Sequence, residues 1–175
     1  NGAGLVDLAR YPRLAAYLRQ NETALSERHI GKKNPSAWYR TIDRVNDALT
    51  ARPKLYLPDF KGRIAPVLDR GETYPHHNLY FIASENWDLE VLGGLLLSDV
   101  AQFFIEAYGV RMRGGFLRFQ AQYLRRIRVP VLMALSETRT AGLKAAFETH
   151  DVARANAIAA EIYQLTPEEV IALGS

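Results

Sequence analysis

The stretch "DLEVLGGLLLSDVAQFFIEAYG", Asp88 to Gly109, contains the longest apolar run of the chain and predicts one central packing helix. Asp88 can cap the first turn, and Gly109 favours termination. Seven apolar residues at helical spacing predict the buried stripe: Leu89, Leu92, Leu96, Val100, Phe103, Phe104 and Ala107. The run "VLGGLLL" is far too short to span a bilayer, so we expect no membrane association.

Two adjacent glycines, Gly93 and Gly94, interrupt this apolar helix. Each costs the helix roughly 1 kcal/mol relative to alanine. A glycine pair at such a cost indicates that another backbone packs closely against the helix at this point.

Three segments before the central helix predict short strands. "KLYLPDF" (54–60) and "HNLYFIASE" (77–85) are aromatic and β-branched, and Pro, Gly or Asn bounds each of them. "RIAPVLDRG" (63–71) is a weaker strand, and Pro66 would confine it to the edge of a sheet.

Helical patterns flank this region on both sides. Pro12 can open a helix that ends at Gly31, with a packing face of Leu14, Tyr17, Leu18, Leu25 and Ile30. After Pro130, two helical stripes form a hairpin: Leu132, Leu135, Leu143, Ala146 and Phe147, then Val152, Ala155, Ile158, Ala159, Ile162 and Tyr163. The sequence "TPEE", with Thr166 as cap and Glu169 reaching back, starts a last short helix.

These segments predict an α+β fold. Short, mostly antiparallel strands form a mixed core with packing helices, and a C-terminal helical hairpin follows. We expect residues 1–35 to be an N-terminal linker and packing helix, 36–130 the core, and 131–175 the helical tail.

The basic segment "RMRGGFLRFQAQYLRRIRVP", Arg111 to Pro130, holds six arginines and no acid. Its pattern predicts a short strand, one helical turn and an extended end before Pro130. From Val131 onward the chain carries six acids against three bases, so a basic middle precedes a mildly acidic tail. A local basic patch of this kind suits a polyanion.

Composition narrows the class of protein. With 175 residues, 48% of them hydrophobic, the chain can bury one sizeable core. Zero cysteines exclude disulfides and thiolate metal sites, and they fit a reducing cytoplasm. The chain opens on "NGAGLVDLARYP", without an initiator methionine, so we expect a fragment of a longer protein.

Enzymatic motifs are absent from the sequence. It has no Gly-rich phosphate loop, no dinucleotide fingerprint and no G-x-S-x-G elbow. His76 and His77 are adjacent, and in a strand their side chains would point to opposite faces. A turn could bring Asp69, Glu72 and His76 together, but the spacing does not require it. We expect no catalytic residue and no metal site in this chain.

Basic and aromatic residues remain as the candidates for binding. Lys32, Lys33, Asn34, Trp38 and Arg40 form one cluster, and Arg111 and Arg113 beside Gly114-Gly115 form a second. Arginine suits bidentate contact with phosphate or guanine, and two glycines let a backbone approach a ligand. A solvated charged face explains either cluster alone; both together favour a nucleic-acid surface.

The order of these segments resembles the C-terminal specificity region of TaqI-like adenine-N6 DNA methyltransferases of restriction–modification systems. The resemblance covers most of the chain, and it lies in "YPRLAAYLRQNETALSERHIGKKNPSAWYR", "PKLYLPDF", "HHNLYFIASENWDLEVLGGLLLSDVAQFFIEAYGVRMRGGFLRFQAQYLRRIRVP" and "AAEIYQLTPEEV".

The resemblance implies that residues 36–130 are a target-recognition core that clamps duplex DNA in the cytoplasm. An N-terminal methyltransferase domain of the same parent chain would bind S-adenosylmethionine and act on a flipped adenine through an Asn/Asp-Pro-Pro-Tyr/Phe motif. That motif is absent here, so we expect an inactive fragment without cofactor. The expected DNA-binding residues are Lys32, Lys33, Trp38, Arg40, Arg111, Arg113, Arg118, Arg125 and Arg126.

Two other functions stay open at this point. The chain is a protein-interaction or scaffold module that docks a partner through its acidic helical tail, or it is a hydrolase that uses Asp69, His76 and His77. Salt dependence of DNA binding separates the first from the DNA hypothesis, because phosphate contacts release counterions.

Overall fold

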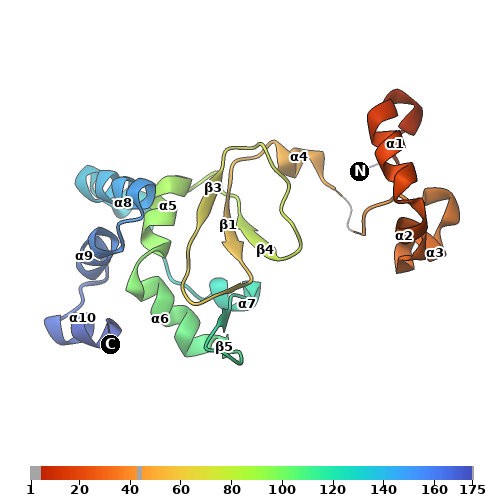
Figure 1. The fold of residues 1–175 in the computed structure, drawn as a ribbon. Coiled ribbons are helices and arrows are strands. Elements are labelled where there is room, and N and C mark those ends of the chain that lie inside the picture. Colours follow the sequence, from red (N-terminus) through yellow and green to blue (C-terminus); the bar gives the residue numbers. More distant parts are fainter. Residues whose placement is uncertain (1–4, 43–44, 175) are drawn as a thin grey trace. The chain divides into compact units, whose positions relative to one another are not determined.

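The computed structural model describes residues 5–42 and 45–174 and divides the chain into two compact units (Figure 1). The first unit runs to Ala48 and the second starts at Leu49, inside the short helix α4 (Asp47–Thr50). Residues 1–4 of the expected linker lie outside the described part of the chain. The boundaries after residues 35 and 130 stay a prediction.

The first unit has short helices where the sequence predicts one long helix. η1 (Leu8–Arg10) precedes α1 (Pro12–Gln20), α2 (Glu22–Glu27), α3 (His29–Lys33) and η2 (Pro35–Ala37). Pro12 opens α1 as predicted, but Asn21 and the extended Arg28 divide the rest. Gly31 lies inside α3 and is not a stop: a Cβ there would come within 2.6 Å of the Leu25 carbonyl oxygen, so glycine lets two turns pack closely.

The second unit opens with an antiparallel sheet of order β3-β1-β4, built from β1 (Lys54–Pro58), β3 (Val67–Asp69) and β4 (Leu79–Ile82). β3 is an edge strand and Pro66 directly precedes it, which confirms the prediction from proline. Leu55 and Leu57 point to one face and are buried in the core.

A second small sheet has the order β2-β6-β5, with β2 (Phe60–Lys61), β5 (Val110–Arg111) and β6 (Leu117–Arg118). Asp59 connects the two sheets through its backbone: its N–H donates to the Asn78 carbonyl at 2.9 Å, and its carbonyl accepts from the Phe119 N–H at 2.9 Å. After β6 come α7 (Ala121–Leu124) and an irregular segment up to Pro130, as the sequence predicts.

The central helix is in fact two helices, α5 (Leu89–Leu96) and α6 (Asp99–Tyr108). Asp88 caps α5 as predicted, but the Ser98 hydroxyl starts a new helix by accepting from the Ala101 N–H. The two axes bend by 66°. The predicted buried stripe is wrong at two positions of α6: Phe103 is 56% exposed, and Ala107 is also exposed.

No single described helix is long and apolar enough to cross a membrane. α5 and α6 reach the required length only as a pair, and this pair is bent.

The glycine pair of α5 packs against α8 (Glu137–Thr149), which confirms the predicted close approach (Figure 1). A Cβ on Gly94 would lie 2.1 Å from the Leu143 carbonyl oxygen, and one on Gly93 would lie 2.5 Å from the Phe147 ring. Phe147 belongs to the same buried cluster as Leu55 of β1. The helical tail therefore shares the core of the second unit.

The rest of the tail follows η3 (Leu132–Ala134) and α8: it comprises α9 (Val152–Tyr163) and α10 (Pro167–Leu173). Thr166 and Glu169 form the predicted capping box of α10. Two small antiparallel sheets, packing helices and a C-terminal helical hairpin make this an α+β fold, as the sequence predicts.

One ion pair on the other face of the first sheet is fully buried. Lys54 on β1 donates to the Asp69 carboxylate opposite it on β3, and Asp69 also accepts from the Thr73 N–H and hydroxyl. The Lys54 hydrogen bond holds the pKa of the Asp69 carboxyl down at about 2. The pair thus fixes the loop after β3 to the sheet.

We expect Gly94→Ala to lower the free energy of unfolding by about 1–3 kcal/mol, because the new methyl group meets a backbone carbonyl that has to shift. The gain in helix propensity, roughly 1 kcal/mol, is too small to offset a backbone displacement. Gly62→Ala is the matched control, since a Cβ there meets no atom within 4 Å. Equal urea midpoints for the two variants would contradict the close packing.

Asp69 makes the fold sensitive to acid. Its folded pKa is below the unfolded value, so its stabilisation is present above about pH 4 and is lost as the pH falls toward 2. We expect Asp69→Asn to be less stable than the parent at neutral pH and to lose less stability between pH 4 and pH 2. Urea unfolding at several pH values measures how the free energy of unfolding of each protein changes with pH. An equal change in the two proteins would contradict the expectation.

Candidate nucleic-acid interface

In the first unit, Arg28 holds the segment that carries Trp38 and Arg40. The Arg28 guanidinium donates to the carbonyls of Trp38 at 3.0 Å and Arg40 at 3.1 Å. Trp38 and Arg40 are half-buried, whereas Lys32 and Lys33 are exposed in the last turn of α3. Sequence analysis did not identify Arg28, because Arg28 binds backbone carbonyls that are ten and twelve residues away along the chain.

In the second unit, two of the predicted arginines each contact the C-terminal end of α6. Arg111 Nη2 lies 3.0 Å from Glu106 Oε2, and the Arg126 guanidinium lies 4.9 Å from the centre of the Tyr108 ring. A helix C-terminus carries partial negative charge and attracts cations. The geometry therefore brings β5 and the segment after α7 to one place.

A tight turn presents Arg113 between β5 and β6. The Met112 N–H donates to the Phe116 carbonyl at 2.8 Å, and the Gly115 N–H donates to the Met112 carbonyl at 3.1 Å. Gly114 and Gly115 have φ angles of 94° and 82°, which residues with a side chain rarely adopt. The glycine pair thus makes the turn, and Arg113 is exposed at its tip.

Arg118 lies on the other side of the ribbon that β5 and β6 form. Arg111 is opposite Leu117, and Val110 is opposite Arg118, so Arg111 and Arg118 face opposite ways. Arg118 Nε is 3.7 Å from Asp59 Oδ1, and Asp59 is only 9% exposed. Arg111 and Arg118 therefore do not belong to one patch.

The basic segment is partly compensated, contrary to the sequence-based expectation. Arg111 pairs with Glu106 and Arg118 with Asp59, and both acids lie outside the acid-free window. The other four arginines form no salt bridge with a described carboxylate: Arg113, Arg125, Arg126 and Arg128. They are exposed and remain the stronger candidates for binding phosphate.

The tail supports this basic segment directly. The Tyr163 hydroxyl on α9 donates to the Arg128 carbonyl at 2.5 Å. Burial raises the pKa of Tyr163 to about 12, so the phenol keeps its proton across the neutral range. No sequence signal pointed to this contact, since 35 residues separate the partners.

The residues of the hydrolase hypothesis are not assembled. Asp69 is bound to Lys54, and the rings of His76 and His77 lie 4.0 Å apart in a turn, so the expectation that they point to opposite faces is wrong. Within residues 5–42 and 45–174, no three His, Asp or Glu side chains are placed to hold a metal ion.

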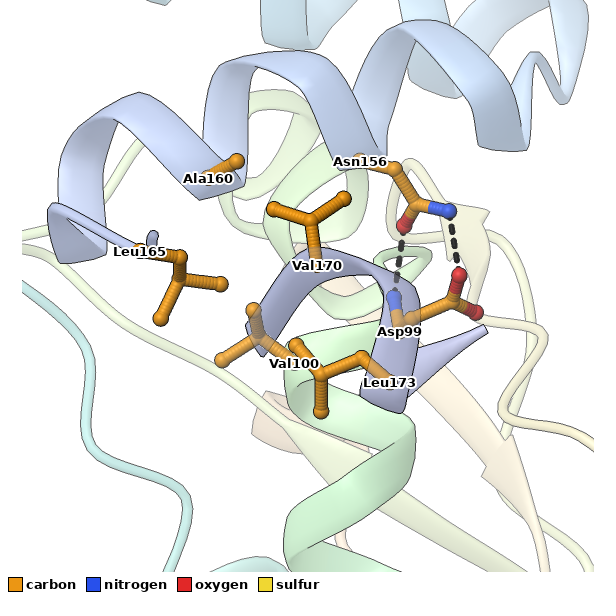
Figure 2. A pocket seen from close by; sticks show the side chains of 7 residues that line it. All are labelled: Asp99, Val100, Asn156, Ala160, Leu165, Val170 and Leu173. Carbon is orange, nitrogen blue, oxygen red and sulfur yellow. Dashed lines mark hydrogen bonds between the residues drawn. The ribbon is translucent and has the colours of Figure 1, made fainter. Parts of the chain in front are cut away.

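A shallow pocket lies between α6, α9 and α10 (Figure 2). Its walls are mostly apolar: Val100, Ala160, Leu165, Val170 and Leu173. Asp99 and Asn156 at its rim bond to each other, with Asp99 N–H to Asn156 Oδ1 at 2.7 Å, and Arg63 pairs with the same Asp99 carboxylate. The bonds between Asp99 and Asn156 join α6 to α9, and the Arg63 pair ties the loop after β2 to the start of α6.

The second unit is a small α+β domain, and each of the two units carries basic residues on its surface. The chain belongs to the family of TaqI-like C-terminal specificity domains, whose model matches residues 11–130. It is 50% identical to the type II methyltransferase M.PaeR7I of Pseudomonas aeruginosa over 98% of its length, and 48% identical to M.XhoI of Xanthomonas vasicola over 94%. M.BstVI of Geobacillus stearothermophilus is 44% identical over 95% of the chain. The chain spans about 30% of the length of these relatives.

Proposed function

We propose that this chain is the DNA target-recognition part of a site-specific adenine-N6 DNA methyltransferase of a restriction–modification system. It binds duplex DNA in the cytoplasm and positions it for an N-terminal methyltransferase domain of the same parent chain, which uses S-adenosylmethionine. Membership in the specificity-domain family supports this function. The observation that carries it is the set of four exposed arginines without a described carboxylate partner.

We infer that the arginines have different roles in binding DNA. Arg113 at the turn, with Arg125 and Arg126 after α7, offers charge that no described acid neutralises, which suits phosphate contacts. Arg111 has Glu106 beside it, so much of its charge is already balanced before DNA arrives. In the first unit, Lys32 and Lys33 are proposed as separate DNA contacts, and Trp38 and Arg40 lie on the segment that Arg28 holds.

Salt dependence of duplex binding tests this proposal. We expect Arg113→Ala to lower the slope of log affinity against log salt by about 0.9, because one phosphate contact is lost. Arg111→Ala should lower it less, because Glu106 already balances much of the Arg111 charge in the free chain. The control is Arg139→Ala, since Arg139 pairs with Glu161 in the acidic tail.

The proposal fails if the chain binds duplex DNA without any dependence on salt, or if Arg113→Ala and Arg139→Ala give the same slope as the parent. Circular dichroism of each variant is the control that its fold is kept.

The cofactor belongs to the other domain under this proposal. We expect calorimetric titration of this chain with S-adenosylmethionine to show no saturable binding at micromolar concentrations, because the sequence has neither the catalytic motif nor a cofactor-binding glycine motif. Saturable binding would contradict the assignment of the cofactor to the N-terminal domain.

A further inference from the structure

One face of the β5–β6 ribbon carries exposed apolar side chains. Val110 is directly opposite Arg118, and the Met112 N–H bonds to the Phe116 carbonyl two residues further along. Since side chains alternate along a strand, these four residues share a face. Val110 is 52% exposed, Met112 42% and Phe116 54%.

The opposite face of the ribbon is bound to the domain. Leu117 is 2% exposed and belongs to the main core cluster, and Arg111 reaches back to Glu106 on α6. The ribbon is therefore attached through this face and along the edge where β2 pairs with Leu117 and Arg118 of β6, and its other face carries an apolar strip of Val110, Met112 and Phe116 beside Arg118. The described pairing with β2 does not continue past Leu117, so the end of the ribbon from Met112 to Phe116 has two strands, and a two-stranded ribbon is narrow enough to enter the major groove of B-DNA.

Asp59 restrains the Arg118 side chain beside this strip. Its carboxylate is buried beside Arg118 Nε, and its backbone is bonded on both sides, to Asn78 and to Phe119. The Arg118 side chain nevertheless keeps 41% of its surface exposed. A buried carboxylate on a fixed backbone limits the directions that the guanidinium can take, as a reading arginine requires.

We propose that the outer face of the β5–β6 ribbon reads base edges in the major groove. Arg118, positioned by Asp59, contacts O6 and N7 of a guanine, and Met112 and Phe116 contact the 5-methyl groups of thymines. Both contacts match the chemistry of those base edges. This inference rests on the proposed function, and it assigns base reading to Arg118 and phosphate contact to the arginines at the turn and after α7.

Charge around the strip favours DNA over a protein partner. Arg113 follows the strip at the turn, and it forms no salt bridge with a described acid. Exposed apolar residues beside cations match thymine methyl groups flanked by phosphates.

Base analogues test the contacts atom by atom. The sequence that the chain prefers is first selected from randomised duplexes. One guanine is then replaced by 7-deazaguanine, which lacks N7, or one thymine by uracil, which lacks the methyl group. We expect 7-deazaguanine at one position to weaken DNA binding by the unmutated chain about 10-fold, and to leave binding by Arg118→Ala unaffected. Replacing the thymine by uracil should weaken DNA binding by the unmutated chain but not by the Phe116→Ser variant.

Asp59→Asn tests the positioning role. We expect it to keep binding to random duplexes and to lose most of the discrimination between guanine and 7-deazaguanine. A residue that only stabilised the fold would change both affinities together. Phe81→Ser is the control for Phe116→Ser, because Phe81 is 44% exposed on β4, in the other sheet. It should keep the full response to uracil.

The outcomes separate the two proposals. If the unmutated chain selects no DNA sequence and binds duplexes without salt dependence, the proposed function fails, and this inference fails with it. If the parent selects a sequence but Arg118→Ala, Asp59→Asn and Phe116→Ser all respond to the analogues as the parent does, the ribbon does not read bases. Variants that lose affinity for the methyltransferase domain and not for DNA would also overturn the inference.

Discussion

The close packing of α5 against α8 is the constraint on which the second unit depends. α5 has the first sheet on one side and α8 on the other, so it is buried almost all round and has to be apolar. Gly93 and Gly94 remove the side chains that would hold the two helices apart. Because Phe147 of α8 then reaches the cluster that contains Leu55 of β1, sheet and tail are parts of one core.

The basic surface is attached to this core at few points. Asp59 joins the two sheets through its backbone and lies beside Arg118 with its carboxylate. Glu106 holds Arg111 at the end of α6, and Tyr163 holds the carbonyl of Arg128. Each contact fixes the side chain or the backbone of one arginine to another part of the second unit. A charged surface that would be mobile on its own thereby has a defined shape, which lowers the entropic cost of binding a ligand.

Local signals in the sequence were sufficient for the caps, the edge strand and the glycine contact. Asp88, Thr166 and Pro66 act through residues within a few positions of themselves, so their effect could be predicted. The break at Ser98 could not, because apolar residues continue at helical spacing on both sides of it. The partners of Arg111 and Arg118 were also missed, since a count of charges within a window omits acids that the fold brings in from outside it.

The contact between Gly94 and Leu143 limits how such domains can be exchanged between enzymes. Recombination at Pro130 would join one parent's α5 to another parent's α8, and any mismatch in the size of the side chains would meet a backbone with no room to adjust. A crossover near Ala48, where the chain divides into compact units, leaves that contact within one parent. Hybrid chains should therefore inherit the β5–β6 ribbon and the helical tail from the same parent.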